Sequence, residues 1–154
     1  MGKFVKISSS GIYQPFPGIT IISKVNQVSS TLWQEIHQVL TDDKLATEYY
    51  SPIPLSSYHM TLCNLVTANS VPKQNLSNYL NKNAQELINL QQLLRELKIR
   101  PMVEISGVTV SKRSIRLILK LNAKQQSQIV ELAKEFKLND KIPGVLHITL
   151  GYQF

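Results

Sequence analysis

Alternating apolar and polar residues predict strands in both halves of the chain. A run rich in β-branched residues predicts a strand over 18–25, and a second strand is expected over 57–66. Two further runs, 102–110 and 114–121, alternate cleanly and predict a hairpin. The last strand is expected over 145–153. Because neighbouring side chains on a strand point to opposite faces, each of these strands would bury one face.

Apolar residues at helical spacing predict helices between these strands. The expected helices span residues 30–41, about 70–100 and 123–137. The first would bury Leu32, Ile36, Val39 and Leu40. The long middle helix carries leucines at near seven-residue spacing, which predicts packing against a sheet or, as the alternative, a dimer seam over 72–99. Residues 42–57 are expected to form a loop stiffened by prolines.

The same order of elements occurs twice along the chain. Strand, helix and strand over 18–66 match strand, helix and strand over 114–153. The pattern predicts an α+β fold in one domain, residues 1–154, with two lobes that each contain one copy of the repeat. The lobes would span about 18–66 and about 101–154, and a helical insert over about 70–100 would link them.

The two strands that close these units share a motif. Tyr58-His59-Met60-Thr61-Leu62 in the first unit is matched by Leu146-His147-Ile148-Thr149-Leu150 in the second. The chain has only 3 histidines, and two of them lie in these copies. Each histidine shares a strand face with the threonine two positions on, and their Cα atoms would lie about 6.8 Å apart.

An imidazole and a hydroxyl at this spacing can converge on one tetrahedral group with several oxygens, for which phosphate is the obvious candidate. Near neutral pH one histidine can accept a proton while the other donates one, and cleavage of a phosphodiester needs such a pair. We therefore expect neither a metal nor a cofactor. A metal site built from His59, His147 and Cys63 is a weaker alternative, because Cys63 shares the face of His59 but lies about 13 Å along the strand.

Two His-x-Thr motifs, one in each half of a small chain, resemble the 2H phosphoesterase superfamily. Pro15-Phe16-Pro17-Gly18-Ile19-Thr20, together with Pro54-Leu55-Ser56-Ser57 before the first motif, is similar to a poorly characterised branch of it. The resemblance spans about residues 13 to 154. It implies a bilobal α+β fold, with two antiparallel sheets related by a pseudo-twofold axis around a central cleft and with helices on the outside.

Charge and composition refine this picture. A formal net charge of +7, from 17 basic and 10 acidic residues, suits an anionic ligand such as RNA or a nucleotide. A single cysteine excludes an internal disulfide and fits a reducing compartment. The longest early apolar stretch, Gly18 to Ile22, is too short to span a membrane. We expect a cytoplasmic protein without a membrane partner, either a monomer or a dimer through the 72–99 seam.

The resulting hypothesis is a metal-independent phosphodiesterase that acts on RNA ends or small nucleotides, such as 2′,3′-cyclic phosphates. His59 and His147 would be the general acid and base in either order, and Thr61 and Thr149 would bind the phosphate. The sequence does not choose among four substrates: a cyclic nucleotide, a 2′,5′-linked oligonucleotide, an RNA 3′ end and an ADP-ribose-derived cyclic phosphate. The alternative from another class is a catalytically inactive RNA- or nucleotide-binding module of the same fold.

Further residues are candidate substrate contacts. They are Tyr50, Lys112, Arg113, Arg116 and Tyr152. Tyr50 could stack on a base or pack in the core, and the basic residues could bind phosphate or cover a solvated hairpin. By simple alternation Tyr152 would lie on the opposite strand face from His147, which weakens it as a base stacker. His37 is expected to be a boundary histidine on the first helix.

Overall fold

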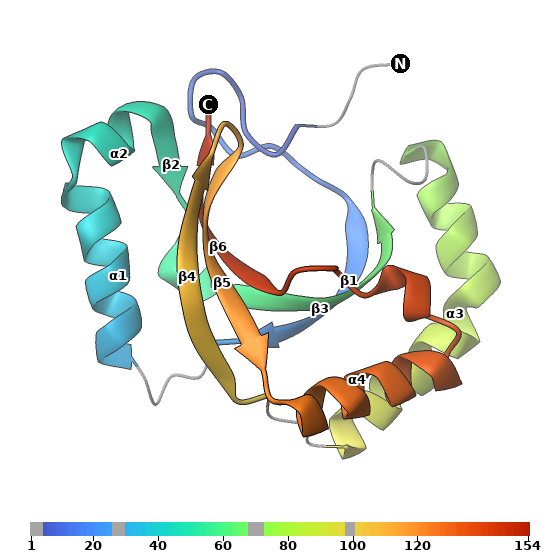
Figure 1. The fold of residues 1–154 in the computed structure, drawn as a ribbon. Coiled ribbons are helices and arrows are strands. Elements are labelled where there is room, and N and C mark those ends of the chain that lie inside the picture. Colours follow the sequence, from blue (N-terminus) through green and yellow to red (C-terminus); the bar gives the residue numbers. More distant parts are fainter. Residues whose placement is uncertain (1–4, 26–29, 68–72, 98–100) are drawn as a thin grey trace.

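One antiparallel sheet of six strands forms the centre of the fold, and helices flank it (Figure 1). The computed structural model describes residues 5–25, 30–67, 73–97 and 101–154. The strand order is β1-β3-β6-β5-β4, with β2 paired to β6 beside this path. The strands are β1 (Gly18–Lys24), β2 (Tyr50–Pro52), β3 (His59–Thr67), β4 (Val103–Ser111), β5 (Ser114–Leu121) and β6 (His147–Gln153).

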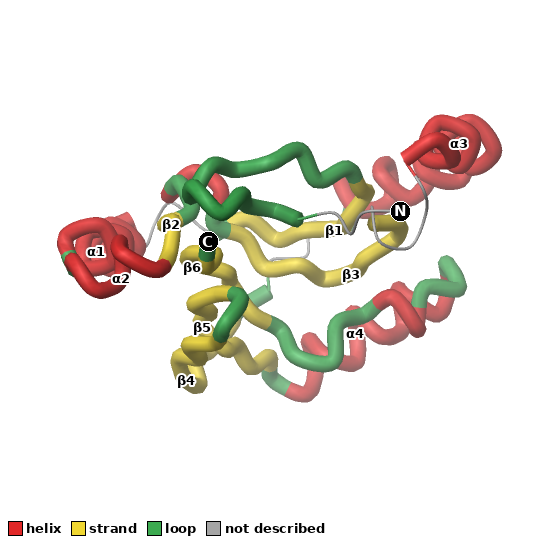
Figure 2. The backbone as a smooth tube through the Cα atoms, turned by 90° about the horizontal axis from the view of Figure 1, so that it is seen from above, coloured by secondary structure: helices red, strands yellow, loops and turns green. Residues whose placement is uncertain are grey.

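Helices cover the sheet from both ends of the molecule. They are α1 (Ser30–Asp42), α2 (Lys44–Tyr49), α3 (Lys73–Glu96) and α4 (Ala123–Glu135), with short 3-10 turns η2 (Leu55–Ser57) and η3 (Asn139–Lys141). Seen from above, α1 and α2 lie at one end and α3 and α4 at the other, with the sheet between them (Figure 2). Within the described residues, no helix is long and apolar enough to cross a membrane.

The predicted strands and helices are confirmed to within a few residues, with one exception. The segment expected to be a loop over 42–57 contains a helix and a strand. Asp43 caps α2, because its side chain accepts a hydrogen bond from the backbone of Ala46 at 2.8 Å. The strand β2 exists through its pairing with the distant β6, which no local pattern reveals.

The expectation of two separate sheets is wrong, because the strands form one sheet. The two motif strands, β3 and β6, pair directly through Met60 and Ile148. This contact joins a first strand pair, β1 and β3, to a second strand pair, β5 and β6. The pseudo-twofold, bilobal arrangement stays a prediction.

The core lies on one face of the sheet, which we call the back face. Its buried apolar residues come from β3 and the residue before it, from β5, β6 and α1: Trp33, Tyr58, Met60, Ile115, Leu117, Leu119, Ile148 and Leu150. The ring of Trp33 meets that of Tyr58 edge-on at 6.3 Å between centroids. Of the residues predicted to face the core from α1, Ile36 and Leu40 pack against it, whereas Leu32 and Val39 are 45% and 67% exposed, because the buried side is centred on Trp33.

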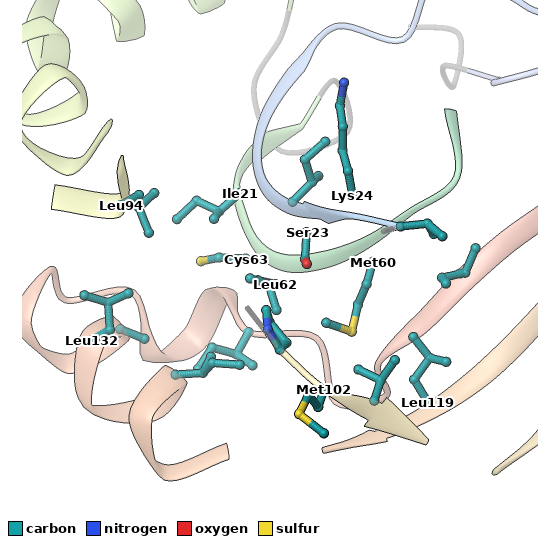
Figure 3. Close-up of a pocket in the computed structure, with 18 of the residues that line it drawn as sticks. Ile21, Ser23, Lys24, Met60, Leu62, Cys63, Leu94, Met102, Leu119 and Leu132 are labelled. Carbon is teal, nitrogen blue, oxygen red and sulfur yellow. The ribbon is translucent and has the colours of Figure 1, made fainter. Parts of the chain in front are cut away.

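A cavity of about 1020 Å³ also opens on the back face, between the sheet and the helices α1, α3 and α4 (Figure 3). Aliphatic side chains form most of its wall, including Leu94 of α3 and Leu132 of α4. The side chains of Met60 and Cys63 lie at this cavity, whereas Lys24 of β1 extends away from it. The sheet therefore separates an apolar face from the face that carries the motif side chains.

Residues 5–17 form a loop beside the C-terminal end of β6 (Figure 1). Its ladder contact is a single antiparallel bridge between Ile7 and Tyr13. The turn between them is closed at Gly11, whose φ of 76° is one that glycine adopts without strain. The backbone of Gln14 donates to the carbonyl of Lys6 at 2.9 Å, so both ends of the turn are tied together.

Candidate active site

The pairing of β3 with β6 brings the two His-x-Thr motifs together. Met60 and Ile148 are direct partners, so their side chains share one face, the back face, where both are buried. The residues on either side of them therefore point to the other face, which we call the site face. Each histidine comes opposite the threonine of the other motif. The four motif side chains are all half-buried: His59, Thr61, His147 and Thr149.

The leucine that closes the first motif is the extra residue of a β-bulge. Thr61 pairs with Ile22 and Cys63 pairs with Ile21, so Leu62 has no partner of its own on β1. A bulge turns the residues that follow it to the other face of the sheet. Cys63 therefore points to the back face, where its thiol lies 4.0 Å from the carbonyl of Leu138, and the expectation that it shares the face of His59 is wrong.

The second motif has the same bulge at the equivalent leucine. Arg116 pairs with Thr149 and the preceding residue of β5 pairs with Gly151, which leaves Leu150 as the extra residue. The bulge brings Tyr152 to the site face, where it pairs with Ser114, two residues before Arg116 on β5. The prediction that Tyr152 lies on the opposite face from His147 is therefore wrong, because simple alternation ignores the added residue.

Both catalytic candidates are held in the same way by a backbone carbonyl two residues upstream. The Nδ1 atom of His59 lies 2.7 Å from the carbonyl oxygen of Ser57, and that of His147 lies 3.1 Å from the carbonyl oxygen of Val145. A carbonyl can only accept a hydrogen bond, so Nδ1 carries the proton in each ring. In the neutral ring this leaves Nε2 as the nitrogen that can accept a proton from a substrate or water.

His147 has the more unusual environment of the two histidines. Burial lowers its pKa, the hydrogen bond to Val145 raises it, and the positive charges of Arg116 and Lys6, with His59, lower it further. The pKa lies below the ordinary value as a result. Near neutral pH the ring of His147 is therefore mainly neutral, which is the state a general base needs.

Arg116 lies on the site face beside the second threonine. Its Nε atom donates to the hydroxyl of Ser114 at 2.6 Å, and Ser114 is the most buried polar residue among those described. Because the partner is fixed in the sheet, the half-buried guanidinium is held in place. Arg116 was one of several basic candidates, and the structure places it next to Thr149 in the ladder.

The N-terminal loop brings a second cation, Lys6, that the sequence did not single out. Its ammonium group donates to the Tyr152 hydroxyl at 2.8 Å and lies 5.0 Å from the centre of that ring. It also lies 5.1 Å from the ring of Phe16, a member of the Pro15–Thr20 segment. Tyr13 completes this group, edge-on to Tyr152 at 6.4 Å. Phe16 belongs to a segment that the sequence analysis singled out, but no sequence pattern indicated that Lys6 would contact its ring.

The other candidates lie near the end of β6 that follows the motif, where Tyr50 pairs with Gln153 and the carbonyl of Arg113 accepts a hydrogen bond from the backbone of Gln153. Tyr50 packs against the core cluster and donates to the carbonyl of Ser111 at 2.9 Å, which favours the packing alternative for this tyrosine. Lys112 and Arg113 are exposed at the turn between β4 and β5.

The third histidine belongs to the core side of α1. Nδ1 of His37 lies 3.2 Å from the hydroxyl of Tyr58, just before β3, and the half-buried ring is the boundary histidine that was expected. Burial raises the pKa of Tyr58 to about 12, so its hydroxyl stays protonated at neutral pH. Within the part of the chain that the structure describes, no group of three histidine, cysteine, aspartate or glutamate side chains could hold a metal ion.

Comparison with known proteins identifies the family. Residues 6–111 match the 2H-phosphodiesterase family described as a domain of unknown function, DUF1868, so the match includes the His59 motif and ends before the His147 motif. The chain is also 28% identical to uncharacterized protein 127L of Invertebrate iridescent virus 6, over 97% of this chain and 72% of the viral protein. No solved structure matches it. The chain belongs to this 2H-phosphodiesterase family, within the 2H phosphoesterase superfamily.

Proposed function

We propose that the protein is a metal-independent phosphodiesterase in which His59 and His147 act as the general acid and base. The observation that carries the proposal is the pairing of β3 with β6, which gathers two histidines and two threonines on the site face. Both rings are fixed through Nδ1, so both Nε2 atoms are available for proton transfer. The substrate class is RNA ends or small nucleotides, such as 2′,3′-cyclic phosphates, in keeping with the net charge of +7.

The lowered pKa of His147 supports its role as the base. Its Nε2 takes a proton from water while the water oxygen forms a bond to phosphorus. The bond from phosphorus to the leaving oxygen breaks, and protonated His59 donates its proton to that oxygen. A 2′,3′-cyclic phosphate would open to a monophosphate, and proton exchange with solvent would restore both rings.

The threonines and Arg116 would bind the phosphate during this step. Hydroxyl donors on both strands can reach the non-bridging oxygens from opposite sides, because each threonine lies across from a histidine. The guanidinium beside Thr149 would add positive charge where negative charge develops. Donors fixed by the sheet need little rearrangement when the phosphorus becomes five-coordinate, and this favours the transition state over the ground state.

The test is turnover of a phosphodiester panel in excess EDTA. The panel contains 2′,3′-cyclic mononucleotides, 2′,5′-linked dinucleotides, RNA with defined 3′ ends and an ADP-ribose-derived cyclic phosphate. We expect His59→Ala and His147→Ala each to reduce turnover by at least about 100-fold, the lower end of what a positioned acid or base contributes.

His37→Ala is the matched control, because it removes the remaining histidine, on the core side of α1. Its turnover should stay within a few-fold of wild type once circular dichroism shows that it is folded. Turnover that persists in the two motif variants, or that EDTA abolishes, contradicts the proposal. Tight nucleotide binding without turnover would identify a binding module of the same fold.

A further inference from the structure

Lys6 is a cation that the fold holds in position at the edge of the site. Its backbone is tied by Gln14, and its ammonium group is held by the Tyr152 hydroxyl and by the faces of two aromatic rings. The hydroxyl of Tyr152 uses one of the three N–H donors of the ammonium. The residue is nevertheless exposed, so an ordered positive charge faces solvent at this position.

Arg116 lies in the same neighbourhood. Both cations lower the pKa of His147, so both act on the ring that we propose as the base. Among the described residues, the only ion pair joins Lys141 to Asp140, so neither cation is neutralised by a carboxylate there. Two positive charges without a carboxylate partner next to one histidine form a region that attracts anions.

One phosphate cannot account for both cations equally well. Arg116 lies across from Thr149 and suits the scissile phosphate. Lys6 lies farther along β6, over Tyr152, which is three residues beyond Thr149 and separated from it by the bulge. When the scissile phosphate of a substrate lies at the histidines, the group that contacts Lys6 is therefore another part of the substrate.

We propose that Lys6 and Tyr152 form a subsite for a second phosphate, so that the enzyme prefers substrates that carry another phosphate beside the scissile one. This inference rests on the proposed function and names its substrate class. The second phosphate is either a 5′-phosphate on a nucleotide or the next phosphodiester of an RNA 3′ end. A lysine already ordered on aromatic rings loses little conformational freedom when it binds a phosphate, so the contact is favourable.

The experiment compares kcat/KM for three substrates with the same base. They are a nucleoside 2′,3′-cyclic phosphate, the same compound with a 5′-phosphate, and a dinucleotide that ends in the cyclic phosphate. We expect wild type to prefer at least one phosphorylated substrate by about 10- to 100-fold, as for a hydrogen bond to a charged group. The substrate that shows the preference identifies the source of the phosphate.

Lys6→Met should remove this preference, and Lys6→Arg should retain most of it because it keeps the charge. Lys134→Met is the matched control, since it removes an exposed lysine on α4, the helix beside the back-face cavity, and should leave the preference unchanged. Equal kcat/KM for all three substrates in wild type overturns the inference. A preference that survives unchanged in Lys6→Met also overturns it.

A binding measurement separates this inference from the proposed function. Calorimetry would compare a nucleoside 2′-monophosphate with the matching 2′,5′-bisphosphate, neither of which needs to be hydrolysed. Tighter binding of the bisphosphate to wild type, but not to Lys6→Met, supports the subsite even if no substrate is turned over. Equal affinity for the two ligands in wild type rejects the subsite, even if the two-histidine mechanism is established.

Discussion

The two strand pairs use the same ladder to place their histidines, but they surround them differently. His59 on β3 has Lys24 of β1 as its direct partner, and His147 on β6 has Ile118 of β5. Lys24 is exposed and extends away from the back cavity, whereas Ile118 is half-buried. The first histidine therefore has a cation directly across the ladder, and the second has an aliphatic side chain.

The partners of the threonines show the reverse arrangement. Thr61 lies across from Ile22, and Thr149 lies across from Arg116. The N-terminal loop then adds Lys6 on the side of the second motif only. Equivalent backbones thus give unequal electrostatics. We infer from this difference that His147 is the base and that additional phosphate binding occurs on its side.

The largest effect should come from removing either histidine, because the proposed mechanism needs one ring as acid and the other as base. In this respect the two strand pairs are equivalent. His59→Ala and His147→Ala should each lower kcat by about 100- to 10,000-fold. The double variant should be about as slow as the slower single variant, because residues that act as a unit are not additive. Initial rates on the best substrate of the panel measure this. Losses that multiply would show that the two rings act independently.

The next effect should distinguish the cations of the two strand pairs. Arg116→Ala should lower kcat/KM by about 10- to 100-fold, because a half-buried guanidinium fixed by Ser114 loses its contact with a charged phosphate. Lys24→Ala should change it by less than about fivefold, as is usual for an exposed charge. Steady-state kinetics of both variants gives the comparison. A larger loss in Lys24→Ala would transfer phosphate binding to the first strand pair.

A smaller effect should appear in the pH dependence. Positive charge lowers the pKa of His147, and the base must be neutral, so activity should rise as pH rises through that pKa. Arg116→Met or Lys6→Met should raise the pKa of His147, which moves the acidic limb of the kcat/KM profile to higher pH. Wild type should show a bell-shaped profile, since the other ring must be protonated.

NMR titration of the His147 ring in the same variants reports the shift directly. Lys112→Met is the control, because Lys112 has no part in lowering the pKa of His147. A limb that stays in place or moves to lower pH in Arg116→Met would contradict the electrostatic account of the second motif.

The sequence was informative wherever the signal was local. Periodicity located α1, α3 and α4, and the repeated His-x-Thr-Leu order located both motif strands. The four motif residues could therefore be chosen from the amino-acid sequence alone. Periodicity located only part of the buried side of α1. Ile36 and Leu40 pack against the core as predicted, but Trp33 is buried in place of Leu32 and Val39, and this choice depends on tertiary packing.

The remainder depended on pairing between distant segments. The bulges at Leu62 and Leu150 each add one residue to a strand, which reverses the faces of the residues that directly follow, so alternation alone misplaced Cys63 and Tyr152. Lys6 reaches the site through a loop whose only ladder contact, within the described residues, is one bridge. Neither the bulges nor the position of Lys6 produces a periodic pattern of residues, so a single sequence does not reveal them.

The smallest effects should come from two glycines that let strands approach closely, one in each strand pair. A Cβ at Gly18 would lie 2.9 Å from the carbonyl oxygen of Val66, whereas one at Gly151 would lie 3.1 Å from that of Ser51. Gly18→Ala should destabilise the fold by about 1–3 kcal/mol, because backbone must move, and Gly151→Ala by less. Gly107→Ala, where a Cβ meets nothing within 4 Å, is the control.

Urea unfolding of the three variants would rank them. If the ranking holds, the order of stability follows how closely the backbones approach, and Gly18 of the Pro15–Thr20 segment is needed for the packing of β1 against β3. If Gly151→Ala is the more damaging, the contact between β2 and β6 is the tighter constraint. The second motif would then depend on β2 for the position of Tyr152, since Ser51 is its direct partner.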